Sequence, residues 1–195
     1  MYQRLILLKE LLNIKGIIIV HLDWKKCHLI RAILDEVFGS TLFLNEIIWK
    51  RQSPSSSKAR AKRFSADHDN LFLYTKSTDY IFNTQYGEYP ENEIKKRFNK
   101  SDEKGRYKDA ELATYSEETF NRLKKENRLI QTKGGKYRYK IYLSEVKGIL
   151  IDTIWPDISP VNSQAQDRTD YPTQKPEALL ERIIKILFKP WGYSF

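Results

Sequence analysis

The sequence predicts an α/β fold in which helices pack on the faces of a β-sheet and a polar lobe is inserted into the chain. Three observations support this prediction. Helical patterns alternate with short β-branched runs over residues 1–77, as is typical of α/β sheets. From residue 78 to about residue 160 the segments become short, charged and rich in tyrosine. A helical pattern then returns after Tyr171.

The first forty residues are predicted to form a helix, a strand and a second helix. Leucines at helical spacing predict a helix over residues 2–13, and Gly16 is placed to end it. The β-branched run at 17–20 is typical of a strand covered on both faces in a parallel sheet. Asp23 is placed to cap the next helix, which ends at Gly39. The apolar face of that helix comprises Leu29, Ile30, Ile33, Leu34, Val37 and Phe38.

The remaining elements follow from the same patterns. Strands are predicted at 42–50 and 70–76, with a loop rich in Ser, Lys and Arg between them. Inside the lobe, 116–127 predicts one polar helix and 137–143 an exposed strand. Pro176 suits the first position of a last helix, because its missing N–H costs nothing there. The apolar face of that helix comprises Leu179, Leu180, Ile183, Ile184, Leu187 and Phe188.

The formal net charge is +9, and the excess lies in the middle of the chain. The stretch from residue 50 to residue 63 contains six basic residues and no acidic one: Lys50, Arg51, Lys58, Arg60, Lys62 and Arg63. Such a cluster is expected of a surface that binds a polyanion. A solvated basic face that binds nothing is the alternative.

Other features restrict the class of protein. Cys27 is the only cysteine, so an internal disulfide is excluded. His21, His28 and His68 lack the companions of a zinc site. No apolar run approaches the roughly 20 residues that span a bilayer, and no signal peptide is recognisable. We therefore expect a soluble cytoplasmic protein without a structural metal or a membrane partner.

The string Y-P-T-Q-K-P-E-A-L-L-E-R-I-I at 171–184 resembles the motif that precedes the cofactor-binding strand in β-class DNA amino-methyltransferases of restriction–modification systems. Other segments resemble this family in the same order along the chain. They are 16–24, 28–39, 45–51, 67–70, 74–77, 102–107, 155–158 and 162–165.

The resemblance implies a fold and a reaction. The fold is a partial Rossmann-like sheet of an S-adenosylmethionine-dependent methyltransferase with an inserted target-recognition lobe. Residues 1–77 would be part of the catalytic half, 78–160 the target-recognition insert and 161–195 the start of the cofactor-binding half. The reaction is methyl transfer from S-adenosylmethionine to the N6 amine of adenine in double-stranded DNA, or to N4 of cytosine, on a base flipped out of the duplex.

Two motifs of the family do not occur in the sequence. Neither a D/N/S-P-P-Y/F string nor an F-x-G-x-G string is found. We therefore expect a chain truncated at both ends, inactive alone and of marginal stability. Its partners would be the missing methyltransferase pieces or a restriction subunit. The alternative is a non-catalytic DNA-binding or specificity fragment that retains the recognition lobe.

Candidate site residues follow from the resemblance and from sheet geometry. By resemblance, Thr173, Gln174, Lys175 and Pro176 line the methionine end of the cofactor site. His21 and Asp23 lie at the carboxyl end of a predicted strand, where α/β sheets bind ligands, although Asp23 is equally explained as a helix cap. The basic cluster of residues 50–63, together with His68, is expected to face DNA phosphates. A surface segment without a ligand is the alternative for its loop.

Overall fold

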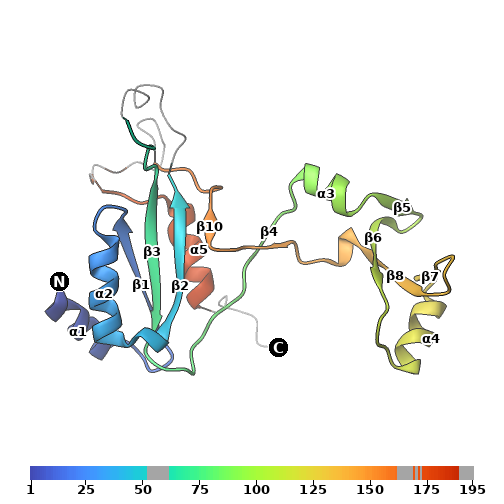
Figure 1. Ribbon diagram of the computed structural model, residues 1–195, viewed down its shortest axis with the longest axis horizontal. Helices are drawn as coiled ribbons and strands as arrows, with labels where there is room; N and C mark the ends of the chain where they lie inside the picture. Colours follow the sequence, from blue (N-terminus) through green and yellow to red (C-terminus); the bar gives the residue numbers. More distant parts are fainter. Residues whose placement is uncertain (52–61, 162–168, 170, 172, 189–195) are drawn as a thin grey trace. The chain divides into compact units, whose positions relative to one another are not determined.

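The computed structural model describes residues 1–51, 62–161, 169, 171 and 173–188 (Figure 1). The chain divides into two compact units, each with its own contacts. We call Met1–Gln85 with Ile151–Phe195 the sheet unit, and Tyr86–Leu150 the lobe unit. The lobe unit falls within the insert predicted at 78–160, and its role in target recognition stays a prediction.

The sheet unit is built on four strands in the order β1-β3-β2-β10. They are β1 (Ile17–Asp23), β2 (Phe43–Lys50), β3 (His68–Thr75) and β10 (Ile154–Trp155). Strand β3 is antiparallel to both of its neighbours, and only β10 runs parallel to its partner β2. The expectation that 17–20 belongs to a parallel sheet is therefore wrong. An apolar run reports burial on both faces of a strand, which an antiparallel neighbour provides equally well.

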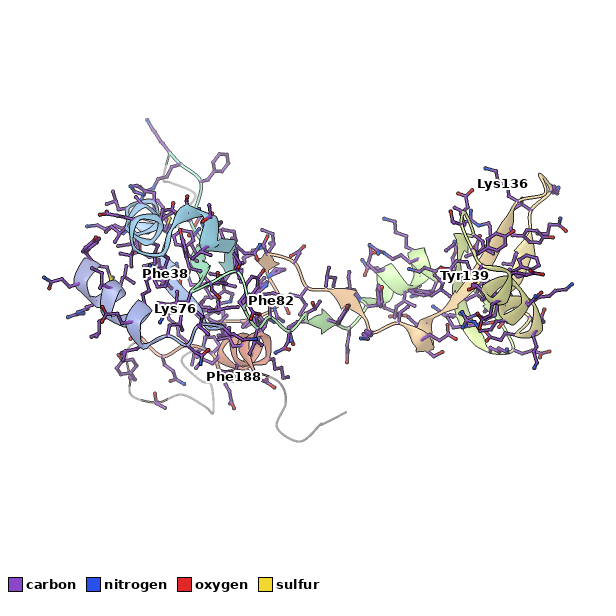
Figure 2. All side chains as sticks on the ribbon, turned by 90° about the horizontal axis from the view of Figure 1, so that it is seen from below. Phe38, Lys76, Phe82, Lys136, Tyr139 and Phe188 are labelled. Carbon is purple, nitrogen blue, oxygen red and sulfur yellow. The ribbon has the colours of Figure 1, made fainter. Side chains whose placement is uncertain are left out.

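Helices cover both faces of this sheet, which confirms the predicted α/β architecture. Helices α1 (Tyr2–Leu11) and α2 (Cys27–Phe38) pack on one face, where Leu34, Phe72 and Tyr74 share a core. Helix α5 (Glu177–Leu187) packs on the other face, where Leu71 and Leu179 share a second core. A single turn, η1 (Ser40–Leu42), joins α2 to β2. Lys76, labelled in Figure 2, donates to the carbonyls of Glu10 and Leu12 and closes the end of α1.

The predicted apolar faces are partly wrong at their margins. Leu29 on α2 is 54% exposed, and Leu180, Ile184 and Phe188 around α5 are exposed as well. Ile186, which the prediction left out, is 4% exposed and belongs to the core. The helical pattern predicted an apolar face wider than the stripe that the sheet covers.

The lobe unit contains a four-stranded antiparallel sheet in the order β5-β6-β8-β7. Its elements are α3 (Glu91–Arg97), β5 (Lys100–Asp102), β6 (Gly105–Glu111), α4 (Glu117–Lys125), β7 (Leu129–Gln131), β8 (Tyr137–Tyr142) and η3 (Leu143–Glu145). Strand β4 (Tyr86–Gly87) pairs with β9 (Ile149–Leu150) where the chain enters and leaves the unit. The predicted polar helix is confirmed as α4, and Ser116 Oγ accepts the Thr119 N–H at its start.

Polar contacts and packed aromatic rings hold the lobe unit together. Asp102 accepts from Lys140 Nζ at 2.7 Å and from the Tyr142 hydroxyl at 2.9 Å. The Lys140 ammonium is the main cause of the lowered pKa of Asp102. Tyr137 packs edge-on against Phe120 at 5.0 Å. Strand β8, which carries Tyr139 (Figure 2), is thus a half-buried inner strand rather than the exposed strand we predicted.

In the part of the chain that the structure describes, no helix combines the length and the apolar character needed to cross a membrane.

Candidate functional site

Polar residues of three strands meet at one edge of the sheet unit. Strands β1 and β2 end at this edge, and the antiparallel β3 begins there. The register therefore sets Asp69 opposite both Asp23 and Trp49, and sets His68 opposite Lys50. We call this region the polar edge.

Asp69 lies at the centre of the polar edge. It is 5% exposed, and its carboxylate contacts one side chain of β1 and the side chain of the residue that follows β2. Oδ2 lies 2.9 Å from His21 Nε2, and Oδ1 lies 3.2 Å from Arg51 Nε. The Arg51 contact is an ion pair and not a hydrogen bond. The buried Nε–H of Arg51 does not point at a hydrogen-bond acceptor among the described residues. One carboxylate thus connects the ends of β1 and β2.

His21 is held in its neutral form. Burial lowers its pKa below the ordinary value of 6.5, and the positive charges of Lys175 and Arg51 lower it further. The hydrogen bond and the negative charge of Asp69 act in the opposite direction without cancelling the effect of burial. The ring packs edge-on against Trp49, with centroids 5.5 Å apart. A neutral imidazole that donates from Nε2 to Asp69 keeps Nδ1 as an acceptor.

The loop before α5 contributes Lys175 to this region. The charge of Lys175 acts on His21, so two residues 154 positions apart in the sequence belong to one electrostatic site. Gln174 holds the loop, because its Oε1 accepts from the Thr169 N–H at 2.6 Å and its N–H donates to Tyr171 O at 3.1 Å. Pro176 is buried at the N-cap of α5, and Thr173 is exposed. The predicted cofactor residues are thus consecutive in one loop but differ in surroundings.

Asp23 is engaged by the backbone. Its Oδ1 accepts the N–H groups of Lys25 at 3.0 Å and Lys26 at 3.3 Å. These bonds hold the turn between β1 and α2, while the N-cap of α2 is Lys26. Asp23 is therefore not the helix cap itself. The residue is exposed, and its contact with a ligand stays a prediction.

The basic cluster is described only in part. Lys50, Lys62 and Arg63 are exposed, and His68 is half-buried opposite Lys50. Lys58 and Arg60 lie outside the described residues. Arg51 differs from the exposed members, because it turns to Asp69 at the polar edge.

Sequence reasoning named the segment 67–70 but missed the part that Asp69 plays. The available signal was three polar residues, His68, Asp69 and Asn70, that open an otherwise apolar strand. Buried polar groups in such a strand need partners, which here are His21 and Arg51 for Asp69 and Glu46 for Asn70. Within the described residues, no group of three or more His, Cys, Asp or Glu side chains is arranged to hold a metal ion.

Comparison with known proteins connects this site to a family. The sequence model for "DNA methylase" matches residues 1–193. The Type II methyltransferase M.EcaI of Enterobacter cloacae is 27% identical over 208 residues, which cover 94% of this chain and 46% of that protein. The StyLTI Mod subunit, from a Type III restriction-modification enzyme of Salmonella typhimurium, is 24% identical over 221 residues, 95% of this chain and 34% of that protein.

A third relative matches over a shorter stretch. The EcoP15I Mod subunit, from a Type III restriction-modification enzyme of Escherichia coli, is 22% identical over 80 residues, 41% of this chain and 12% of that protein. The chain spans less than half the length of each of these relatives. The family match extends over nearly all of the chain, as the order of the motifs predicted, and the chain belongs to the DNA methylase family.

Proposed function

We propose that this chain forms part of an S-adenosylmethionine-dependent DNA methyltransferase that modifies the N6 amine of adenine, with N4 of cytosine as the alternative. The observation that carries the proposal is the polar edge itself. It brings Lys175, from the loop that resembles the family's cofactor motif, into the electrostatic surroundings of His21 at the end of β1. Ends of sheet strands are where α/β folds bind nucleotide cofactors.

The side chains of the polar edge suit polar groups in two parts of such a cofactor, the methionine moiety and the adenosine moiety. The ammonium of Lys175 is suited to the carboxylate of the methionine moiety, and the exposed hydroxyl of Thr173 offers a further donor. The neutral imidazole of His21 offers an acceptor. Bound S-adenosylmethionine would supply the electrophilic methyl group. The residues described here would bind and orient it.

We propose that the 195 residues alone do not transfer methyl groups. No D/N/S-P-P-Y/F string is present to hold the target amine in attack geometry, and positioning supplies much of the rate enhancement in such reactions. The test is incubation of the purified chain with labelled S-adenosylmethionine and DNA, followed by nucleoside analysis. Methylated adenine or cytosine above a blank without enzyme would disprove inactivity and would also identify the base.

We further propose that the basic cluster contacts DNA phosphates. If about four side chains touch phosphate, log K should fall with log salt concentration with a slope near −3.6, about −0.9 per contact. Replacing Lys58, Arg60, Lys62 and Arg63 with Ala should flatten the slope and weaken binding to all sequences alike. Arg51→Ala should change the slope less, because Arg51 is paired with Asp69. An unchanged slope in the quadruple variant would move the DNA site elsewhere, with the lobe unit as the next candidate.

The second candidate function is DNA binding without catalysis. The observation that favours it is the lobe unit, which is compact through its own internal contacts. S-adenosylhomocysteine distinguishes the two candidates, since a purely DNA-binding chain has no reason to bind it. Two relatives are named Mod subunits of Type III restriction-modification enzymes. A restriction subunit is accordingly the protein partner that we propose, beside the methyltransferase segments that the chain does not contain.

A further inference from the structure

Asp69 is the residue through which the polar edge is organised. Its carboxylate is almost fully buried, yet it belongs to neither hydrophobic core. Burying a carboxylate costs free energy unless charged or hydrogen-bonding partners compensate it. Its partners are His21 on β1 and Arg51, the residue that follows β2, and both strands end at this edge. The arrangement orients side chains on two strands at the place where the proposed cofactor site lies.

The contact with Asp69 decides which atom of His21 remains available. In a neutral imidazole one nitrogen carries hydrogen and the other accepts, and the partner of one nitrogen sets the tautomer. A carboxylate can only accept. The 2.9 Å contact therefore puts the proton on Nε2 and leaves Nδ1 as the acceptor. A flip of the ring would put Cε1 in the place of Nε2 and break this contact, and the edge-on packing against Trp49 opposes such a flip.

The charges around His21 restrict the ligand group that Nδ1 can accept from. Lys175 and Arg51 are positive, and Asp69 is the negative group that acts on the ring. These three charges sum to one positive charge, which would repel a cationic donor but not an uncharged hydroxyl or amino group. An adenosine moiety carries such uncharged donors on its ribose and on its base.

We infer that Asp69 is a positioning residue, which holds His21 as the Nε2–H tautomer so that Nδ1 accepts a hydrogen bond from an uncharged donor of an adenosine moiety. The inference rests on the proposed function, because it assigns the adenosine to the proposed cofactor. The role of Asp69 itself concerns only the free protein and can be tested without a ligand.

The first test uses the unliganded wild-type protein and nitrogen NMR of the His21 ring at pH 7. The expected spectrum shows hydrogen on Nε2 and a bare Nδ1. Asp69→Asn should lower the pKa of His21, because a negative charge that raises it is lost, and should introduce the second tautomer. Hydrogen on Nδ1 in the wild type, or an unchanged tautomer and pKa in Asp69→Asn, would overturn the inference.

A matched control separates positioning from loss of stability. Asp35 on α2 also joins two side chains, with Arg31 Nε at 3.1 Å and the Tyr74 hydroxyl at 2.6 Å. Its partner Tyr74 belongs to the core between the sheet and helices α1 and α2, away from the polar edge. Asp35→Asn should lower the melting temperature as Asp69→Asn does, yet leave the His21 tautomer and pKa unchanged. If both variants change His21 equally, Asp69 has only a structural role.

Calorimetry with S-adenosylhomocysteine and with adenosine tests the ligand part. Asp69→Asn should weaken the binding of both ligands by the same factor, about tenfold, because that is the scale of one hydrogen bond to a polar group. Asp35→Asn should leave both affinities unchanged. Wild-type protein that binds neither ligand would contradict the proposed function and the adenosine assignment, while the NMR result would still decide the role of Asp69. If Asp69→Asn weakened the binding of S-adenosylhomocysteine but not that of adenosine, Nδ1 would contact the amino acid part, and the adenosine assignment would be overturned.

Discussion

At the scale of single residues, the polar edge makes folding depend on pH. His21 has a pKa below 6.5 in the folded chain, chiefly because it is buried. Between that lowered pKa and 6.5 the unfolded chain binds more protons than the folded chain. The free energy of unfolding therefore rises with pH across this window, and the contribution of a neutral His21 is lost as the pH falls.

Replacing His21 with Gln should reduce this pH dependence, since Gln does not titrate. We expect the slope of unfolding free energy against pH below 6.5 to become flatter, as measured by urea denaturation at a series of pH values. His28→Gln is the control, because His28 is exposed on α2. Equal slopes in the wild type and in His21→Gln would contradict the burial of a neutral imidazole.

At the scale of elements, backbone geometry in the lobe unit gives a second prediction. Gly148 has a φ of 121°, and a Cβ at this position would lie 2.2 Å from the carbonyl oxygen of Gly87. Gly148→Ala should therefore disrupt the pairing of β4 with β9 and cost about 2 kcal/mol or more. Gly134→Ala is the matched control, because a Cβ there meets nothing within 4 Å and its φ is not in the left-handed region. Equal melting temperatures of the Gly148→Ala and Gly134→Ala variants would contradict this prediction.

The elements also show what the sequence could predict. Apolar spacing and capping residues located α2, α4, α5 and the strands β1, β2, β3 and β8 within a few residues, because these are local signals. The short strands β4, β5, β6, β7, β9 and β10 were not predicted. The direction of β1 could not be predicted, since a β-branched run does not encode the orientation of its neighbour. The exposed positions Leu180 and Ile184 were assigned to the core, because helical spacing does not reveal how much of a helix the sheet covers.

The candidate site was predictable in its parts but not in its connections. His21 and Lys175 were named separately, one from strand geometry and one from the resemblance. Asp69 joins His21 to Arg51 across two strand boundaries, and such a contact depends on register, which a single sequence does not give. The proposed DNA residues stay a prediction, and Lys58 and Arg60 lie outside the described residues.

At the scale of the whole molecule, one side of the sheet unit exposes apolar surface. Strand β1 pairs with β3 on one side, and none of the described strands pairs with its other side. Arg182 of α5 lies over Trp155 near β10, so Leu180 and Ile184, about half a turn away, lie on the flank toward β1. A cavity of about 380 Å³ at the start of β1 is lined mainly by apolar residues, Ile17 and Leu187 among them, together with Asn13 and Lys15.

An open strand edge beside exposed apolar side chains favours self-association. We expect the wild-type chain to associate at tens of micromolar, and Ile184→Lys to reduce this association in sedimentation experiments. Leu29→Lys is the control, because Leu29 and Ile184 are both 54% exposed and Leu29 lies on α2. A monodisperse wild-type monomer would contradict the predicted association. A sharp cooperative melt would contradict the marginal stability that the sequence predicts.

The central claim is that the polar edge is the part of a cofactor site that this chain contributes. NMR titration of the labelled protein with S-adenosylhomocysteine tests it most directly. The claim predicts that the signals of His21, Thr173 and Lys175 shift together and saturate, with those of the lobe unit unaffected. Signals that stay unchanged at the polar edge up to the solubility limit of the ligand, or shifts confined to the lobe unit, would contradict it.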